Sequence, residues 1–272
     1  MIQWPGNNRM ALLLTFDFDA ESVWLARDPE NAGRLGVLSQ GLYGARRAVP
    51  KLLELLDAEK LPATFFIPGW VAEHHTDRCK EVRDAGYEIG HHGYSHGWAD
   101  AARPQAECDD FDRGTEALDR FLGVRPVGYR PPGAEITRNT LTMLTDRGML
   151  YNSNMLDDVY PYRHVLPDGR QGPIELPTHW SIGDANYTWN SIRHPKVIQT
   201  SEHIFTIWKD EFDAHYEWGA LFNLVLHPQM IGRPSRVALL RRFIDYVRGF
   251  DGVWIATCAD VAAHIASLDT KG

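Results

Sequence analysis

Cysteine is scarce in this sequence, and neither its number nor its spacing supports a cross-linked framework. The 272 residues include three cysteines, Cys79, Cys108 and Cys258, which are odd in number and too far apart for a zinc ribbon. This usage indicates a reducing compartment. No apolar run reaches membrane-spanning length, and residues 1–6 lack the basic and apolar regions of a secretory signal. We therefore expect a cytoplasmic protein with no membrane partner.

Positive charge is also in short supply. Lysine and arginine number 28 against 36 aspartates and glutamates, which gives a formal net charge of -8 without a basic cluster. A nucleic-acid partner is therefore not expected, because its phosphates require a positive face. The sequence has no internal repeat, no low-complexity stretch and no glycine-rich phosphate loop after its first apolar run. We predict a single domain over residues 1–272, and a nucleotide-binding fold is disfavoured.

What the chain does contain is a regular alternation of short apolar runs and amphipathic helices. We expect strands at 11–16, 63–67, 87–90, 127–130, 149–153, 174–176, 221–226 and 253–257. We expect helices at 46–59, 71–85, 105–122, 137–147, 202–216 and 235–248, and a last one from 259. Such a pattern is typical of a parallel sheet that is covered on both faces. It predicts an α/β fold, a distorted (β/α) barrel with seven or eight parallel strands, and an open doubly wound sheet is the alternative.

Chemically capable side chains follow several of these strands. In a parallel barrel the loops after the strands gather at one rim, so these residues are expected to meet there. The first strand is followed by Asp17 and Asp19, the third by His92 and His96, the fourth by Arg130 and the seventh by His227.

Two pairs within this set have spacings that suit a metal site. Asp17 and Asp19 are two apart, so an extended backbone directs both carboxylates to one side. His92 and His96 are four apart, so a helical turn or a tight loop brings their rings together. Two imidazoles and a carboxylate form a facial set for zinc, iron or cobalt. The alternatives are a solvated turn for the two aspartates and buried, hydrogen-bonded rings for the histidines. The side chain of His91 is expected to point away from that of His92.

The remaining rim residues suit proton transfer. Arg130 lies between a tyrosine and two prolines, and it could hold Asp17 ionised or form a structural ion pair. His227 lies at the tip of an apolar strand just before Pro228, a position for a general acid or for a strand-end hydrogen bond. His194-Pro195 has the same dipeptide without an apolar strand, so it is left out of the site. His74-His75 is interpreted as a solvated helix face.

Together these segments resemble the polysaccharide deacetylase (NodB-homology) family. The resemblance is carried by five motifs, of which the clearest are Thr15-Phe16-Asp17-Phe18-Asp19, His92-Gly93-Tyr94-Ser95-His96, Arg130-Pro131-Pro132-Gly133 and Leu224 to Pro228. It implies that Asp17 is the catalytic base, that Asp19, His92 and His96 bind the metal, that Arg130 supports the base and that His227 is the acid. The fourth motif is matched only loosely, by Trp180 and Asp184.

One departure narrows the resemblance. Phe18 separates two aspartates that are adjacent in the secreted deacetylases, which resembles a branch of cytoplasmic small-amide enzymes with allantoinase-like and cyclic-imide-cleaving members. Allantoinase-like members lose the second motif histidine. Because His96 is kept here, a divalent metal is expected, zinc first and cobalt or iron as alternatives.

These features predict a metal-dependent hydrolase of non-peptide carbon–nitrogen bonds in a small amide, imide or N-acyl compound. Asp17 would take a proton from metal-activated water, His227 would protonate the leaving nitrogen, and the backbone N–H of Tyr94 would help to hold the oxyanion. Tyr94, Trp180 and Glu21 are the predicted substrate-binding residues. The aromatic residues of 151–189 could stack a sugar, close over an imide or form a homo-oligomer interface. An N-acetyl-sugar polymer deacetylase and a non-catalytic metal- or carbohydrate-binding module are the alternative functions.

Overall fold

The computed structural model describes residues 2–191 and 195–269, and its centre is a curled sheet of nine strands. The strand order is β6-β7-β5-β4-β3-β2-β1-β8, with β9 also beside β1. The strands are β1 (Met10–Asp17), β2 (Thr64–Ile67), β3 (Glu88–His91), β4 (Gly128–Tyr129), β5 (Tyr151–Asn152), β6 (Tyr162–Val165), β7 (Gln171–Glu175), β8 (Leu221–Leu226) and β9 (Val253–Ala256). All neighbours are parallel except β6 and β7. The predicted α/β barrel with its parallel strands is confirmed, and the antiparallel β6 was not predicted.

The strand β1 is buried along its whole length, which explains its continuous apolar run. Its alternate residues face opposite sides of the sheet. Leu12, Leu14 and Phe16 pack into the cluster formed with the outer helices, whereas Ala11 and Leu13 pack on the other side with α12 (Cys258–Asp269).

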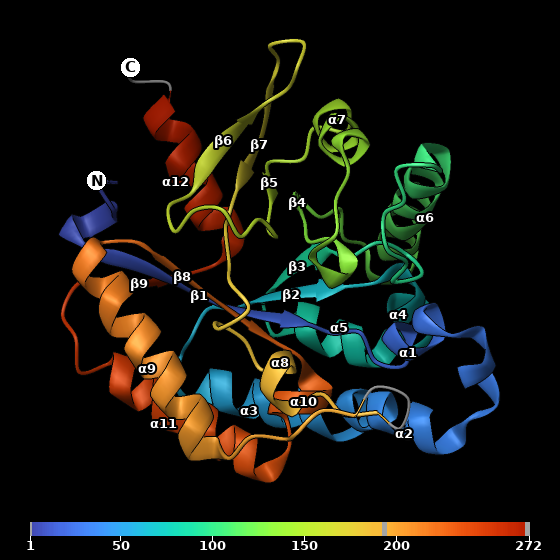
Figure 1. Ribbon diagram of the computed structural model, residues 1–272, viewed down its shortest axis with the longest axis horizontal. Coiled ribbons are helices and arrows are strands. Elements are labelled where there is room, and N and C mark those ends of the chain that lie inside the picture. Colours follow the sequence, from blue (N-terminus) through green and yellow to red (C-terminus); the bar gives the residue numbers. More distant parts are fainter. Residues whose placement is uncertain (1, 192–194, 270–272) are drawn as a thin grey trace.

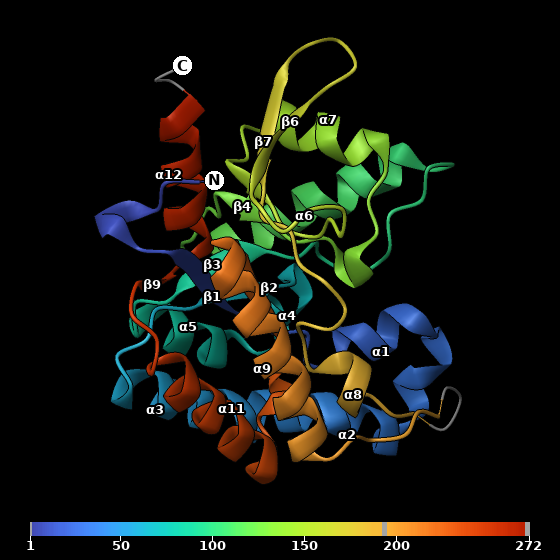
Figure 2. The same cartoon turned by 60° about the vertical axis from the view of Figure 1, so that its left-hand side comes forward.

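Helices cover both sides of this sheet. Figures 1 and 2 show α3 (Val49–Ala58), α9 (Ser201–Trp218) and α11 (Pro234–Val247) together on one side of β1 and β8, and α12 on the other. Beyond β3, the helices α6 (Pro104–Leu122) and α7 (Arg138–Asp146) flank the far part of the sheet (Figure 1). These helices lie near the expected positions because their ends carry local signals. Thr200 caps α9, and α6 ends at Gly123 in the left-handed conformation.

Several shorter elements differ from the expectations. The helix expected at 71–85 is two helices, α4 (Gly69–His74) and α5 (Thr76–Asp84), which are separated at His75. The ring Nε2 of His75 lies 2.8 Å from Oε2 of Glu21, so the solvated-face interpretation is wrong for this residue. In the described part of the chain, four α-helices were not predicted, namely α1 (Ser22–Arg27), α2 (Leu35–Tyr43), α8 (Ala185–Thr188) and α10 (Pro228–Ile231).

Among the residues that the structure describes, the strands β7 and β8 are not paired by a ladder of backbone hydrogen bonds. Side-chain hydrogen bonds and one isolated bridge connect the two ends of the curled sheet instead. The amide Nδ2 of Asn223 donates to the carbonyls of Leu176 and Pro177 at 3.1 and 3.3 Å. Farther along, Gly183 pairs with Val225 in a single parallel bridge. These contacts bring the chain after β7 against β8, and they place Asp184 beside the end of that strand.

Two further observations concern the expectations on cysteine and membranes. Cys79, Cys108 and Cys258 are all free thiols. Within 2–191 and 195–269, none of the helices combines the length and the apolar character needed to cross a bilayer.

Candidate active site

The side of the sheet that faces the barrel interior changes from apolar to polar toward the carboxyl ends of the strands. On β1 the inward residues run from Ala11 and Leu13 to Thr15 and Asp17, and on β8 Asn223 follows Leu221. The hydroxyl of Thr15 lies 3.4 Å from Oδ1 of Asn223. A polar site therefore forms at the end of the barrel where the strands stop.

The first two site residues come from the end of β1. Phe18 is fully buried among the outer hydrophobic residues, and its N–H donates to the carbonyl of Phe66 at 2.8 Å. This anchoring places Asp17 and Asp19 on the other side of the chain, where both line one cavity. The same-side prediction for the two carboxylates is thus matched by the structure.

The two histidines come from the loop after β3. Gly93 has a φ of 69°, and a Cβ there would lie 2.8 Å from Oδ2 of Asp110. The carboxylate of Asp110 accepts the N–H groups of Tyr94 and Ser95 at 2.8 and 3.0 Å, which holds the loop in its turn. His96 itself has a φ of 62°, and this tight loop brings its ring to 5.1 Å from that of His92.

His91 takes no part in this cluster. Its Nε2 donates to the carbonyl of Phe111 at 3.0 Å, and its Nδ1 accepts the N–H of Gly93. Burial lowers the pKa of His91 to about 3, so the ring is neutral and structural. His91 points away from the site as expected, and His194 lies outside the described residues.

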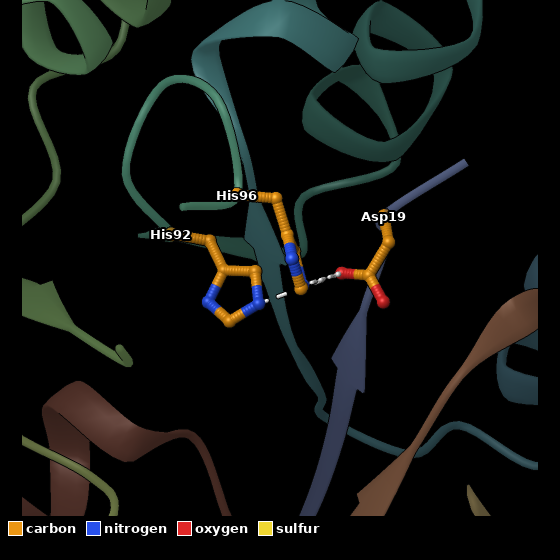
Figure 3. Close-up of side chains that lie close together, drawn as sticks. All are labelled: Asp19, His92 and His96. Carbon is orange, nitrogen blue, oxygen red and sulfur yellow. Dashed lines mark ion pairs between the residues drawn. The ribbon is translucent and has the colours of Figure 1, made fainter. Parts of the chain in front are cut away.

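Asp19, His92 and His96 converge on a single point (Figure 3). Oδ1 of Asp19 lies 3.4 Å from Nε2 of His92 and 3.5 Å from Nε2 of His96. The three residues are buried, and one ligand atom of each lies within 4.8 Å of the others. Oδ1 of Asp19 has no hydrogen-bond partner among the described residues. Nδ1 of His92 donates to the carbonyl of Arg130 at 2.6 Å, which leaves its Nε2 free to act as a ligand. This donor set fits a divalent cation.

The second carboxylate oxygen of Asp19 is held by a glutamine that follows β8. The buried Gln229 donates from Nε2 to Oδ2 of Asp19 at 3.3 Å. Burial by itself would raise the pKa of Asp19, but its interactions with the neighbouring His96, His92 and His227 outweigh this effect and hold the pKa well below its usual value. Asp19 is therefore an ionised carboxylate with one oxygen restrained and one oxygen available.

Arg130 is the fixed cation beside the other aspartate. Its Nη1 donates to Oδ1 of Asp17 and to the hydroxyl of Thr15, both at 2.8 Å. Its Nη2 donates to the hydroxyl of Ser153 at 2.9 Å and to Oδ1 of Asn223 at 3.2 Å. The guanidinium is thus fully engaged, and Asp17 is oriented by a buried charge-assisted contact.

His227 forms the opposite wall and is oriented by a carboxylate from the chain after β7. Its Nδ1 lies 2.8 Å from Oδ1 of Asp184, and its Nε2 lies 3.8 Å from Oδ2 of Asp17. Burial would lower the pKa of His227, but the carboxylates of Asp184, Asp19 and Asp17 raise it to about 9. The imidazolium is therefore the form present near neutral pH, with Nε2–H directed toward the site.

The predicted substrate-binding residues do not share one place. A cavity of about 370 Å³ contains the site, and the half-exposed Trp180 lines it. Glu21 and Tyr94 are not among its lining residues within the described chain. Glu21 pairs with His75, and the Tyr94 hydroxyl donates to Glu73 at 2.7 Å. The N–H of Tyr94 already donates to Asp110, so its expected role as an oxyanion donor is wrong.

Sequence reasoning missed three contacts that organise the site. Gln229 was not predicted, and its position two residues after His227 is the sequence signal for its contact with Asp19. Asn223 and Ser153 lie in ordinary strand and loop positions and carry no sequence signal for their contacts with Arg130. Asp184, from the loosely matched fourth motif, pairs with His227.

Comparison with known proteins places the chain in a family. The family model described as polysaccharide deacetylase matches residues 39–151. The peptidoglycan deacetylase-like protein FGM2 of Gibberella zeae is 30% identical over 263 residues, which cover 84% of this chain and 77% of that protein. This chain belongs to the polysaccharide deacetylase family. The predicted NodB homology is confirmed, and the chain is a hydrolase of amide C–N bonds.

Solved structures of related proteins cover the whole fold. A crystal structure of a Mycobacterium smegmatis protein assigned to the polysaccharide deacetylases is 37% identical, with a TM-score of 0.95 over 98% of this chain and 94% of that chain. Puue allantoinase is 25% identical, with a TM-score of 0.83 over 96% of this chain and 92% of that chain. The same fold thus occurs in a protein named a polysaccharide deacetylase and in one named an allantoinase.

Proposed function

We propose that this family member is a metal-dependent hydrolase that cleaves the amide bond of a small amide, imide or N-acyl compound. The observation that carries the proposal is the convergence of Asp19, His92 and His96 on one point, with Asp17 and His227 beside it. A ligand set, a proton acceptor and a proton donor are the three components that amide hydrolysis requires.

The cation would be held by Oδ1 of Asp19 and by Nε2 of His92 and His96. When bound there, a divalent ion supplies Lewis acidity, which lowers the pKa of water and polarises a carbonyl. Zinc suits two imidazoles and a carboxylate, and cobalt and iron accept the same set. Gln229 would leave Oδ1 as the oxygen of Asp19 that is available to the cation, because it already donates to Oδ2.

The protein's own groups then move the protons. Asp17 accepts a proton from the attacking water, and Arg130 keeps this carboxylate in place during the transfer. His227 gives its Nε2 proton to the nitrogen that leaves, and Asp184 holds the ring in the required orientation. The carbon–nitrogen bond breaks as the protonated nitrogen departs, so the products are a carboxylic acid and an amine from an amide or N-acyl compound, or a carboxylic acid and an amide group from an imide.

The acid role of His227 predicts a shift in the pH profile of Asp184→Asn. Activity requires the protonated ring, so it is retained below the pKa of His227 and lost as pH rises through that value. Because the Asp184 carboxylate raises this pKa, its removal is expected to move the basic limb of kcat/KM to lower pH, by about one unit or more. The measurement is a pH–rate profile of the wild type, of Asp184→Asn and of Asp119→Asn, a surface control. An unmoved basic limb in Asp184→Asn would contradict the acid assignment.

The size of the cavity favours a small substrate. A volume of about 370 Å³ is close to the lower end of the usual range for ligand pockets. The alternative, an N-acetylated sugar, is favoured by the exposed Trp98 and Trp180, which line the same cavity and could stack against a pyranose ring. The name of the Gibberella zeae relative supports the same alternative.

A substrate panel decides between these candidates. The zinc-loaded protein is incubated with cyclic imides and ureides, with monomeric N-acyl compounds and with N-acetylglucosamine oligomers, and the release of amine or acid is measured. We expect the small compounds to be hydrolysed. The N-acetylglucosamine oligomers are expected to be hydrolysed more slowly, at a rate that does not increase with oligomer length. Rates that rise steadily with oligomer length would favour the polymer, and no hydrolysis in any arm would overturn the proposed function.

A further inference from the structure

The site cavity has a cationic side chain on its wall that the proposed chemistry does not use. Arg27 is the last residue of α1, and it lines both the site cavity and an adjoining cavity of about 550 Å³. No residue of 2–191 or 195–269 forms a hydrogen bond or an ion pair with its guanidinium. Arg130, the other arginine that lines the site cavity, is already bonded to Asp17, Thr15, Ser153 and Asn223.

The position of Arg27 is fixed by an aromatic base. Its Cζ lies 4.3 Å from the ring centroid of Trp189, and Trp189 in turn stacks on Trp24 with ring centroids 4.9 Å apart. Both indoles are buried in a cluster with Val23 and Met230. A guanidinium stacked on a rigid ring loses little further freedom when it binds a ligand, so its fork of N–H donors is preorganised.

The charges around the cavity make this cation distinctive. Asp17, Asp19 and Asp184 line its deeper part, and Glu135 also lines it. The charge of Asp19 acts on Arg27 from a distance, but none of these carboxylates forms an ion pair with it in the described chain. Lys196 adds a second cation to the lining. Asp17 and Asp184 already have cationic partners in Arg130 and His227, so the wall that carries Arg27 is the part of the cavity that would attract an anionic substrate group.

We infer that the amide substrate carries a carboxylate and that Arg27 recognises it, as a specificity-determining residue on the wall of the site. The inference rests on the proposed amide hydrolysis. A planar guanidinium with free donors pairs bidentately with a carboxylate, and stacking on Trp189 leaves its edge available for that contact. A substrate of the same shape that carries a neutral carboxamide in place of the carboxylate would leave Arg27 without an anionic partner.

The test compares substrates that differ only in this charge. The zinc-loaded full chain is assayed with hydantoin-5-acetic acid against its carboxamide, and with N-acetylmuramic acid against its carboxamide. In at least one pair we expect the acid to have a kcat/KM about 10- to 100-fold higher than the carboxamide, the range of a charge-assisted hydrogen bond. The preference should decline in 1 M salt, because the interaction is partly exposed.

Variants assign the preference to Arg27. Arg27→Gln is expected to remove it, mainly by raising KM for the acid, and Arg27→Lys is expected to keep part of it. Arg125→Gln, which removes an exposed arginine paired with Asp119, is the matched control and should keep the full preference.

The outcomes are distinguishable. Hydrolysis of acid and carboxamide at equal kcat/KM by the wild type, or an equal loss on both in Arg27→Gln, overturns this inference and leaves amide hydrolysis standing. If neither member of any pair is hydrolysed while neutral amides of the wider panel are, this inference fails and amide hydrolysis stands. If the wider panel is inert as well, the proposed function fails and this inference fails with it.

Discussion

Replacing His92 with alanine is expected to remove the bound metal and to lower the rate of amide hydrolysis by at least about 10³-fold, since a catalytic cation contributes several kcal/mol to the transition state. His92 supplies one of the three atoms that converge within 4.8 Å, and its other nitrogen is fixed on the carbonyl of Arg130. The measurements are metal content after dialysis and turnover on a hydrolysed amide. Zinc should also raise the melting temperature of the wild type but not of the variant.

Two controls separate loss of metal from loss of fold. His74→Ala removes an exposed histidine that stacks on Trp70 outside the site, and it should keep both metal and activity. Chelation of the wild type should abolish turnover without any substitution, and added zinc should restore it. Full activity in metal-free wild type, or zinc binding in His92→Ala equal to that of the wild type, would refute the metal assignment.

Asp17→Asn is expected to lower kcat by about 10²- to 10⁴-fold, the range of a lost general base. The asparagine oxygen can still accept the Arg130 contact at 2.8 Å, so the geometry should be kept while the proton acceptor is lost. Asp17 is not among the residues of the metal cluster, so the variant should bind zinc as the wild type does. This combination distinguishes a base from a ligand.

The measurements for Asp17→Asn are single-turnover rates, metal content and thermal stability. Because Arg130 is buried, loss of its charged partner is expected to cost some stability, which makes the melting curve a necessary check. Asp119→Asn, at an exposed ion pair, is the control. Retention of activity within about 3-fold, which would not fit loss of a general base, would move the base role away from Asp17.

Much of the fold could be read from local patterns. The run from Ala11 to Phe16 is continuous because β1 has neighbours on both sides and packs against helices, and its alternation explains why Asp17 faces inward. The helix α2 could not be found in this way. It contains two glycines, which weaken local helical preference, and Gly41 is required because a Cβ there would lie 2.4 Å from the carbonyl oxygen of Ala20. Packing against the site turn, rather than propensity, stabilises this helix.

The same distinction applies to the site. The sequence alone determined that two aspartates follow one strand, two histidines a second, an arginine a third and another histidine a fourth. The carboxyl ends of parallel strands meet at one rim of a barrel, so these residues had to lie near one another. Tertiary structure alone decided which oxygen of Asp19 is free, that Gln229 holds the other, and that Glu21 and Tyr94 turn to His75 and Glu73. It also placed Arg27 on Trp189. Spacing along one strand or one turn fixes direction over a few residues, whereas contacts between residues far apart in the chain depend on how whole elements pack, and no local periodicity records that.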